Sequence, residues 1–165
     1  MLEKLTKSLE DNQNISFDEM KIVMDEILNG NHRDEIVATF LQSLSKKGET
    51  DDELLGMLDK MNEFSVHISP NCPKKIIDMC GTGGDSSGTF NVSTAASFVV
   101  AAAGVPVAKH GNRSMTSKSG SADVLEAMGI NISLSIEDVS ECIDKIGIGF
   151  MFAPSLHPAM KHAMG

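Results

Sequence analysis

The fold of this chain is decided by the stretch Ile76-Ile77-Asp78-Met79-Cys80-Gly81-Thr82-Gly83-Gly84-Asp85. An apolar run leads directly into three glycines within four positions, and Asn91-Val92-Ser93-Thr94 then opens an alanine-rich stretch. This order predicts a strand, a glycine turn (Gly81–Asp85) and a helix N-terminus. Glycine lets backbone N–H groups approach a ligand closely, and a helix N-terminus presents unpaired N–H groups with partial positive charge. The combination favours an anion site, most often for phosphate, although a tight turn without a ligand has the same pattern.

A second polar segment follows the next apolar run, Val105-Pro106-Val107-Ala108. This polar turn (Lys109–Ser121) contains three cations, four serines and one threonine. Because parallel strands end at the same edge of a sheet, the two turns are expected to face one crevice.

The predicted fold class is α/β, with a small N-terminal helical bundle followed by a truncated parallel-sheet domain. Residues 1–69 are expected to form the helical domain and residues 70–165 the α/β domain, incomplete at its C-terminus. Ser16 to Glu19 and Thr50 to Glu53 have capping-box spacing, and Asn31 is expected to cap the helix between them. The apolar positions expected to face inward on the fourth helix are Leu54, Leu55, Leu58, Met61 and Phe64.

From residue 75 the pattern alternates between strands and helices, which predicts a parallel sheet. Strands are expected at 76–80, 105–109 and 148–152, with a short extended piece at 130–132. Helices are expected at about 93–103, 121–128 and 136–146, with a last helical turn opening at His157-Pro158. Three strands make a thin sheet. We therefore expect this chain to be the N-terminal part of a longer protein, or to be completed by a partner chain.

Composition narrows the function. The 165 residues have a net charge of −9, which argues against a broad nucleic-acid interface. An acidic chain that binds phosphate must do so locally, through backbone amides, a few cations and a metal ion. No segment approaches the roughly 18 apolar residues of a membrane span, and the N-terminus lacks a signal-peptide core. Cys72, Cys80 and Cys142 show no zinc-site spacing, so free, buried thiols in a reducing cytoplasm are expected.

Polar residues around the glycine turn are more numerous than a single helix cap requires. Asp85 can hold a metal ion or a ribose hydroxyl, or simply cap the turn. The other hydroxyls and the amide cluster at the predicted helix start, at Thr89, Asn91, Ser93 and Thr94. This excess favours a ligand over a cap alone.

The polar turn leaves several alternatives open. Lys109 is expected at a strand end, facing the crevice, although a surface lysine has the same pattern. His110 is either a packed residue or a catalytic one. Arg113 and Lys118 either bind phosphate or pair with carboxylates such as Asp123 and Glu126. The pattern suggests catalysis by positioning and charge stabilisation, without a nucleophile.

Four segments in series resemble the anthranilate phosphoribosyltransferases, in a family related to the nucleoside phosphorylases. They are Gly81-Thr82-Gly83-Gly84-Asp85, Asn91-Val92-Ser93-Thr94, Lys109-His110-Gly111-Asn112-Arg113-Ser114 and Lys118-Ser119-Gly120-Ser121-Ala122-Asp123. The resemblance runs along essentially the whole chain but covers only about the first half of the family's usual length.

The resemblance implies transfer of phosphoribose from phosphoribosyl pyrophosphate (PRPP) to the amine of anthranilate, in tryptophan biosynthesis, with Mg²⁺. It also implies a cytoplasmic homodimer joined through the helical domain. Ser93 would ligate Mg²⁺, Asn112 would reach anthranilate, and Gly81 would border it. His110 is a weak candidate for handling the amine proton. The substrate-binding positions that it implies are Gly81, Gly84, Asp85, Thr89, Asn91, Val92, Ser93, Thr94, Lys109, His110, Gly111, Asn112, Arg113, Ser114, Met115, Thr116, Ser117 and Ser121.

The family's acidic pair for a second Mg²⁺, and its arginine for the anthranilate carboxylate, lie beyond residue 165. We therefore expect little transferase activity from this chain alone. Two other hypotheses stay open at this point: an enzyme like the pyrimidine nucleoside phosphorylases, and a non-catalytic dimerisation or ligand-binding module.

Overall fold

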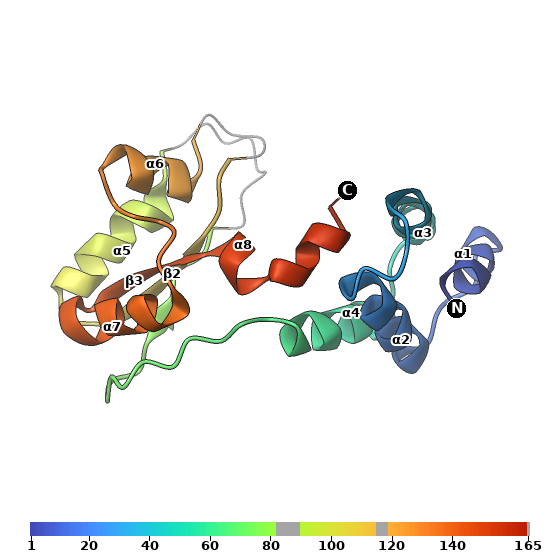
Figure 1. Cartoon of the computed structure of the whole chain (residues 1–165), viewed down its shortest axis with the longest axis horizontal. Helices are drawn as coiled ribbons and strands as arrows, with labels where there is room; N and C mark the ends of the chain where they lie inside the picture. The colour runs from blue at the N-terminus through green and yellow to red at the C-terminus, as the bar shows by residue number, and fades with distance from the viewer. Residues whose placement is uncertain (82–89, 115–118, 165) are drawn as a thin grey trace. The chain divides into compact units, whose positions relative to one another are not determined.

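The computed structural model of the chain describes residues 1–81, 90–114 and 119–164 (Figure 1). These residues form two compact units. One contains Met1–Ser65 together with the C-terminal segment that begins at His157, and the other contains Val66–Leu156. The domain limits expected from the sequence, 1–69 and 70–165, stay a prediction.

The first unit is built from α1 (Leu2–Glu10), α2 (Phe17–Leu28), α3 (Asp34–Lys47) and α4 (Asp51–Glu63). Both predicted capping boxes are present, at the starts of α2 and α4. The predicted cap at Asn31 is wrong, because Arg33 is the residue before α3 and makes no side-chain cap bond. Asn31 instead donates its backbone N–H to Glu26 O at 3.0 Å. It thereby closes the turn in which Gly30 adopts a φ of 72°.

The inward face of α4 agrees with the prediction only in part, since Met61 and Phe64 pack against the core of the helical unit and the three leucines do not. Leu54, Leu55 and Leu58 are 50%, 54% and 52% exposed, while Glu53 and Gly56 are buried. A Cβ on Gly56 would lie 2.8 Å from Phe17 O, so this glycine lets α4 approach α2 closely. The helix is therefore rotated toward its small residue, and the leucines lie on the outside.

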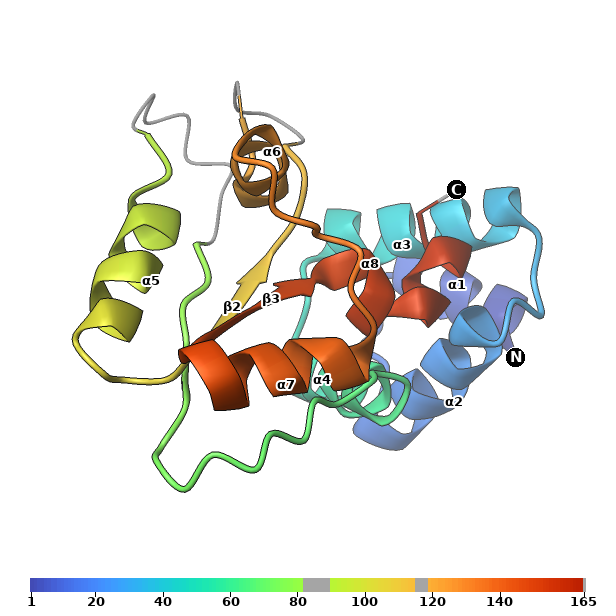
Figure 2. The ribbon, with the colours of Figure 1, turned by 60° about the vertical axis from the view of Figure 1, so that its left-hand side comes forward.

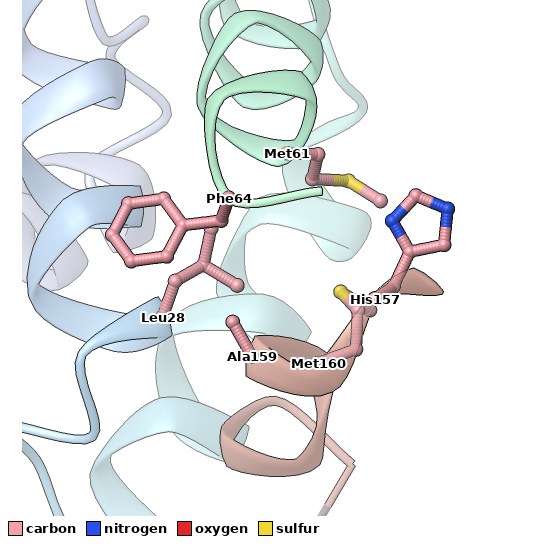
Figure 3. A pocket seen from close by; sticks show the side chains of 6 residues that line it. All are labelled: Leu28, Met61, Phe64, His157, Ala159 and Met160. Carbon is pink, nitrogen blue, oxygen red and sulfur yellow. The ribbon is translucent and has the colours of Figure 1, made fainter. Parts of the chain in front are cut away.

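The C-terminal segment, with the 3-10 helix η1 (Pro158–His162), packs on the helical unit. Figure 3 shows α2 and α4 facing this segment across a small pocket whose side chains end in carbon and sulfur, apart from one imidazole. The lining residues are Leu28, Met61, Phe64, His157, Ala159 and Met160. This lining indicates apolar packing and offers no convergent polar groups for a substrate.

The second unit contains three parallel strands in the order β1-β2-β3, which confirms the predicted fold class. The strands are β1 (Ile77–Asp78), β2 (Val107–Gly111) and β3 (Ile148–Phe152). The helices are α5 (Val92–Ala102), α6 (Ser121–Ala127), α7 (Ile136–Ile146) and α8 (Ala153–Leu156). The predicted helix at 136–146 and strand at 148–152 have the limits found in the structure.

Helices cover both faces of this sheet (Figure 2). On one face, Val139 and Ile143 of α7 pack with Ala108 and Met151 of the strands. On the other, Ala122 and Leu125 of α6 and Phe98 of α5 pack with Phe150. This two-layer cover is what a parallel sheet requires.

Several predicted limits are corrected. The first strand is shorter than 76–80, and the second runs from Val107 to Gly111 rather than over 105–109. Pro106 has no N–H to donate to the ladder, and the second strand's pairing begins at Val107. No strand forms at 130–132 among the described residues, and the short helix α8 was not predicted.

Two expectations about the whole chain have outcomes as well. The three cysteines are free thiols, but their expected burial is wrong, because Cys80 is exposed and Cys72 and Cys142 are half-buried. Within the described ranges, no helix has the length and apolarity to cross a membrane.

Candidate functional site

The start of the glycine turn lies against the first turn of α5. β1 leads into Gly81, and a Cβ placed on Gly81 would lie 3.2 Å from Ser93 Oγ. The hydroxyl of Ser93 therefore faces the backbone at the beginning of the turn. Other predicted site residues lie outside the described part of the chain: Gly84, Asp85, Thr89, Met115, Thr116 and Ser117.

Asn91 links the N-terminus of α5 to the polar turn. It is the N-cap residue, but its side chain makes no cap bond. Its amide donates instead to the carbonyl oxygens of Ser119 and Gly120, each at 3.2 Å. The segment that follows the glycine turn and the end of the polar turn thus lie together, at the side of the sheet where β1 and β2 end.

Helix α5 buries two hydroxyl side chains beside Phe98 and leaves two valines exposed. Thr94 and Ser97 are buried, whereas Val92 and Val99 are exposed. Ser97 Oγ donates to Ser93 O at 2.7 Å. In the described part of the chain, Thr94 Oγ1 is the one buried side-chain atom without a hydrogen-bond partner. A buried hydroxyl left unpaired costs about 1–3 kcal/mol, so its presence at a helix N-terminus needs a reason.

Lys109 does not end a strand, as the sequence suggested, but is the third residue of β2. It is 2% exposed, and its Nζ donates to His110 O at 2.7 Å. Burial lowers the pKa of Lys109, and the charges of Cys80 and Asp78 oppose that shift only in part. A buried, weakly solvated ammonium group beside the polar turn is well placed to attract an anion.

His110 is held by a residue that the sequence analysis did not single out. Asp78 Oδ1 accepts the His110 backbone N–H at 3.3 Å, and Asp78 Oδ2 lies 3.9 Å from His110 Nδ1. The carboxylate therefore ties the end of β1 to the end of β2. The charge of Asp78 inside the apolar run 76–80 was the sequence signal that could have identified it as a site residue.

Arg113 pairs with carboxylates, which was one of the two predicted alternatives. Its Nη1 and Nη2 donate to Glu126 at 2.8 and 3.0 Å, and Nη1 also donates to Asp123 at 3.3 Å. The hydrogen bonds and charge of Glu126 raise the pKa of Arg113, and Arg113 in turn lowers the pKa of Glu126. The pKa of Asp123 is lowered first by the backbone N–H groups of Ser114 and Gly120.

The two ends of the polar turn pack closely. Ser121 Oγ and the Ala122 backbone N–H both donate to Asn112 O, at 3.4 and 3.2 Å. A Cβ on Gly111 would collide with Ser121 Oγ, so the backbone has no room for a larger residue there. The predicted site residues Gly111, Asn112 and Ser121 are thereby brought together.

Comparison with known proteins matches these features to one family. Residues 3–65 match the helical bundle domain of a glycosyl transferase family, and residues 73–165 match its a/b domain. The chain belongs to this glycosyl transferase family. The resemblance inferred from the four motif segments is thus confirmed at the level of the family.

Individual members of the family agree with this assignment. Anthranilate phosphoribosyltransferase of Nitrosopumilus maritimus is 54% identical over 162 residues, which are 98% of this chain and 47% of that protein. The crystal structure of anthranilate phosphoribosyltransferase from Thermus thermophilus matches 96% of this chain and 48% of its own, with a TM-score of 0.84 and 38% identity. The chain spans about half the length of the curated relatives it matches.

A more distant family structure shows the fold alone. Anthranilate phosphoribosyltransferase from Saccharomyces cerevisiae, solved in complex with PRPP and Mg, matches 98% of this chain and 48% of its own. The TM-score is 0.76 at 24% identity.

Proposed function

We propose that this chain forms the donor-binding half of an anthranilate phosphoribosyltransferase, which transfers phosphoribose from PRPP to the amine of anthranilate. The main support is the pair of hydrogen bonds from the Asn91 amide to Ser119 O and Gly120 O. They hold a helix N-terminus and a polar turn at one edge of a parallel sheet, which is where such folds bind ligands. The relatives from Nitrosopumilus maritimus and Salinibacter ruber, which match nearly the whole chain, are anthranilate phosphoribosyltransferases.

The proposed roles follow the chemistry of the reaction. As pyrophosphate leaves, negative charge builds up on it while the sugar carbon becomes cationic. The backbone N–H groups of Ser93 and Thr94, at the N-terminus of α5, stabilise the first of these charges, and the buried Lys109 ammonium adds to them. The Val92 N–H already donates to Phe90 O at 2.7 Å. The unpaired Thr94 hydroxyl can donate to a phosphate oxygen. Asn112 is proposed to contact anthranilate, and His110 to accept the amine proton.

Mg²⁺ is part of the proposal, with Ser93 as its protein ligand. Mg²⁺ prefers hard oxygen ligands and usually keeps several waters and substrate phosphates around it. The Ser93 hydroxyl, against Gly81, fits this partial role. The described residues contain no group of three His, Cys, Asp or Glu side chains that could enclose a metal, so most ligands would come from pyrophosphate and water. When bound, the ion supplies positive charge that neutralises the leaving group.

We also propose that this chain alone has little transferase activity, and that the protein is a cytoplasmic homodimer joined through its helical unit. The exposed apolar residues Val92 and Val99 on α5 support the first point, because such a face is normally covered in an α/β domain. Sedimentation of the isolated chain tests the dimer. An activity assay with PRPP, anthranilate and Mg²⁺ tests the first point, and turnover comparable to that of a full-length relative would contradict it.

Calorimetry tests the proposed ligand directly. PRPP with Mg²⁺ is expected to bind the chain, and a pyrimidine nucleoside with inorganic phosphate is not. Asn91→Ala is expected to weaken PRPP binding because it breaks both links between α5 and the polar turn. Asn29→Ala, in the helical unit, is a matched control that should leave binding unchanged. Nucleoside binding without PRPP binding would show that the proposal is wrong.

A further inference from the structure

The carboxylate of Asp123 joins two points of the polar turn, Ser114 and Gly120. Its Oδ2 accepts the backbone N–H of Ser114 at 3.0 Å and that of Gly120 at 2.7 Å. Asp123 is the third residue of α6, and Gly120 is the N-cap of that helix. One oxygen therefore fixes the start of α6 and, at the same time, the backbone six residues before it.

The peptide groups of Gly120 are held on both sides. The Gly120 N–H donates to Asp123, while the Gly120 carbonyl accepts from the Asn91 amide. A Cβ on Gly120 would lie 2.6 Å from Arg113 C and 2.6 Å from Asn112 O, so only glycine fits this approach. A displacement of Asp123 would therefore reach Asn91, at the N-terminus of α5.

The guanidinium group of Arg113 binds two carboxylates of α6. Two parallel hydrogen bonds to Glu126 use both terminal nitrogens, and a third reaches Asp123 Oδ1. This two-pronged geometry is specific to the guanidinium group. The side chains are partly exposed, so the ion pairs alone contribute little to stability. Their effect is to orient Asp123.

We propose that Asp123 is a positioning residue of the donor site, and that Arg113 acts on Asp123 and Glu126 and does not contact phosphate. This inference rests on the proposed function for its effect on PRPP. The effect of Asp123 on the geometry of the turn does not depend on the proposed function, because the experiment on that geometry contains no ligand.

The first experiment compares Asp123→Asn with Asp138→Asn. Asp138 is also the third residue of a helix, α7 in the same unit, and its change removes the same charge away from the turn. In ¹H–¹⁵N spectra without ligand, Asp123→Asn should shift the Ser114 and Gly120 amides upfield and speed their hydrogen exchange. Asp138→Asn should leave both unchanged. Unmoved Ser114 and Gly120 amides in Asp123→Asn would overturn the proposal.

The second readout is PRPP affinity with Mg²⁺. If charge alone mattered, removing a carboxylate near an anion site would strengthen binding. Positioning predicts the opposite, about a tenfold loss for Asp123→Asn, since charge-assisted bonds to two amides are weakened. Stronger binding by this variant would overturn the proposal. Absence of PRPP binding by the unmodified chain would refute the proposed function, and the amide spectra would still decide the role of Asp123.

Arg113→Lys and Arg113→Gln test the second part. Lysine keeps the charge and loses the two-pronged geometry, so both variants should weaken PRPP binding by a similar factor. Arg113→Lys binding as tightly as the unmodified chain, with Arg113→Gln much weaker, would indicate a direct phosphate contact and overturn this part.

Should Asp123→Asn fail to fold, acid titration of the unmodified chain tests the role of Asp123. Its Ser114 and Gly120 amides should then titrate together, and separate titration would overturn the proposal.

Discussion

Replacing Lys109 by methionine is expected to stabilise the α/β unit and to weaken PRPP binding. Lys109 is 2% exposed in the middle of β2, and within the described residues it makes one hydrogen bond, to His110 O. Methionine is unbranched and of similar length, so it can fill the same space without a charge. The change thus separates the electrostatic contribution of the ammonium group from its packing.

The magnitude follows from two opposing effects. Taking one ion out of water costs several kcal/mol even after relaxation. The hydrogen bond to a charged donor returns about 1.5–3 kcal/mol of this, and methionine loses it. The difference favours Lys109→Met by about 1–2 kcal/mol, using these typical values. In a chain of this size, each kcal/mol corresponds to a rise of about 2–4 °C in Tm.

The pH dependence gives an independent check. Burial lowers the pKa of Lys109, so between that value and the ordinary 10.5 the unfolded chain binds more protons than the folded one. Stability of the unmodified chain should therefore rise with pH through this alkaline window, and the gain is complete above the unfolded value. Lys109→Met lacks this titration, so its advantage should shrink as the pH rises.

Urea unfolding measures the stability gain and its pH dependence. Far-UV circular dichroism follows the unfolding, since the chain has no Trp or Tyr for fluorescence. Lys145→Met is the control, because Lys145 is an exposed residue of α7 paired with Glu141. Its change should stay within about 0.5 kcal/mol. If Lys109→Met proves less stable than the unmodified chain, or binds PRPP equally well, the reasoning about this lysine is refuted.

Three further changes test other parts of the structure. Thr94→Val removes the unpaired buried hydroxyl, so stability should be unchanged or raised by about 1 kcal/mol while PRPP affinity falls; a loss of stability would reveal a partner for that hydroxyl. Glu53→Ala should cost about 3–5 kcal/mol, because Glu53 is fully buried and accepts from Ile15 N–H, Lys47 and Thr50. Burial raises the pKa of Glu53, but these donors outweigh burial, so the pKa in the folded chain is lowered. The stability that Glu53 contributes is therefore present above the unfolded pKa near 4.5 and is lost as the pH falls through the folded pKa. Chemical unfolding from pH 7 to pH 3 would show this loss of stability. Phe40→Ala should cost about 3–5 kcal/mol and Leu58→Ala less than about 0.5, since the first is buried and the second is half exposed; equal costs in urea unfolding would place Leu58 in a buried contact.

Local chemistry explains which parts of the fold were predictable. Ser16 with Glu19, and Thr50 with Glu53, are contacts over three residues, so the sequence displays both partners together. The face of α4 was not predictable in this way. Glu53 is buried because it accepts from Ile15, 38 residues earlier, and no periodicity records that contact. A leucine-rich stripe was therefore taken for the inner face, and the rotation of α4 was missed.

In the candidate site, too, features that follow from local or sheet geometry were predictable, and contacts between residues distant in the sequence were not. That two turns would meet follows from the geometry of parallel strands, and the Asn91 hydrogen bonds agree with it. The partners of Arg113 stayed open because they depend on where α6 begins relative to β2. Asp78 was missed since its contact with His110 joins residues 32 apart. In each case the motif was visible, while the hydrogen bonds that orient it were not.

The positions that local rules explain least lie on β2 and α5. Lys109 is a buried ammonium group with one acceptor, and Thr94 is a buried hydroxyl without a partner in the described part of the chain. Stability alone would favour apolar residues at both positions. Such departures concentrate where a sequence serves a ligand. The double variant Thr94→Val/Lys109→Met should therefore be at least as stable as Lys109→Met and bind PRPP more weakly than either single variant, measured by urea unfolding and calorimetry. A double variant that loses stability would place these two groups in the framework of the fold and remove them from the donor site.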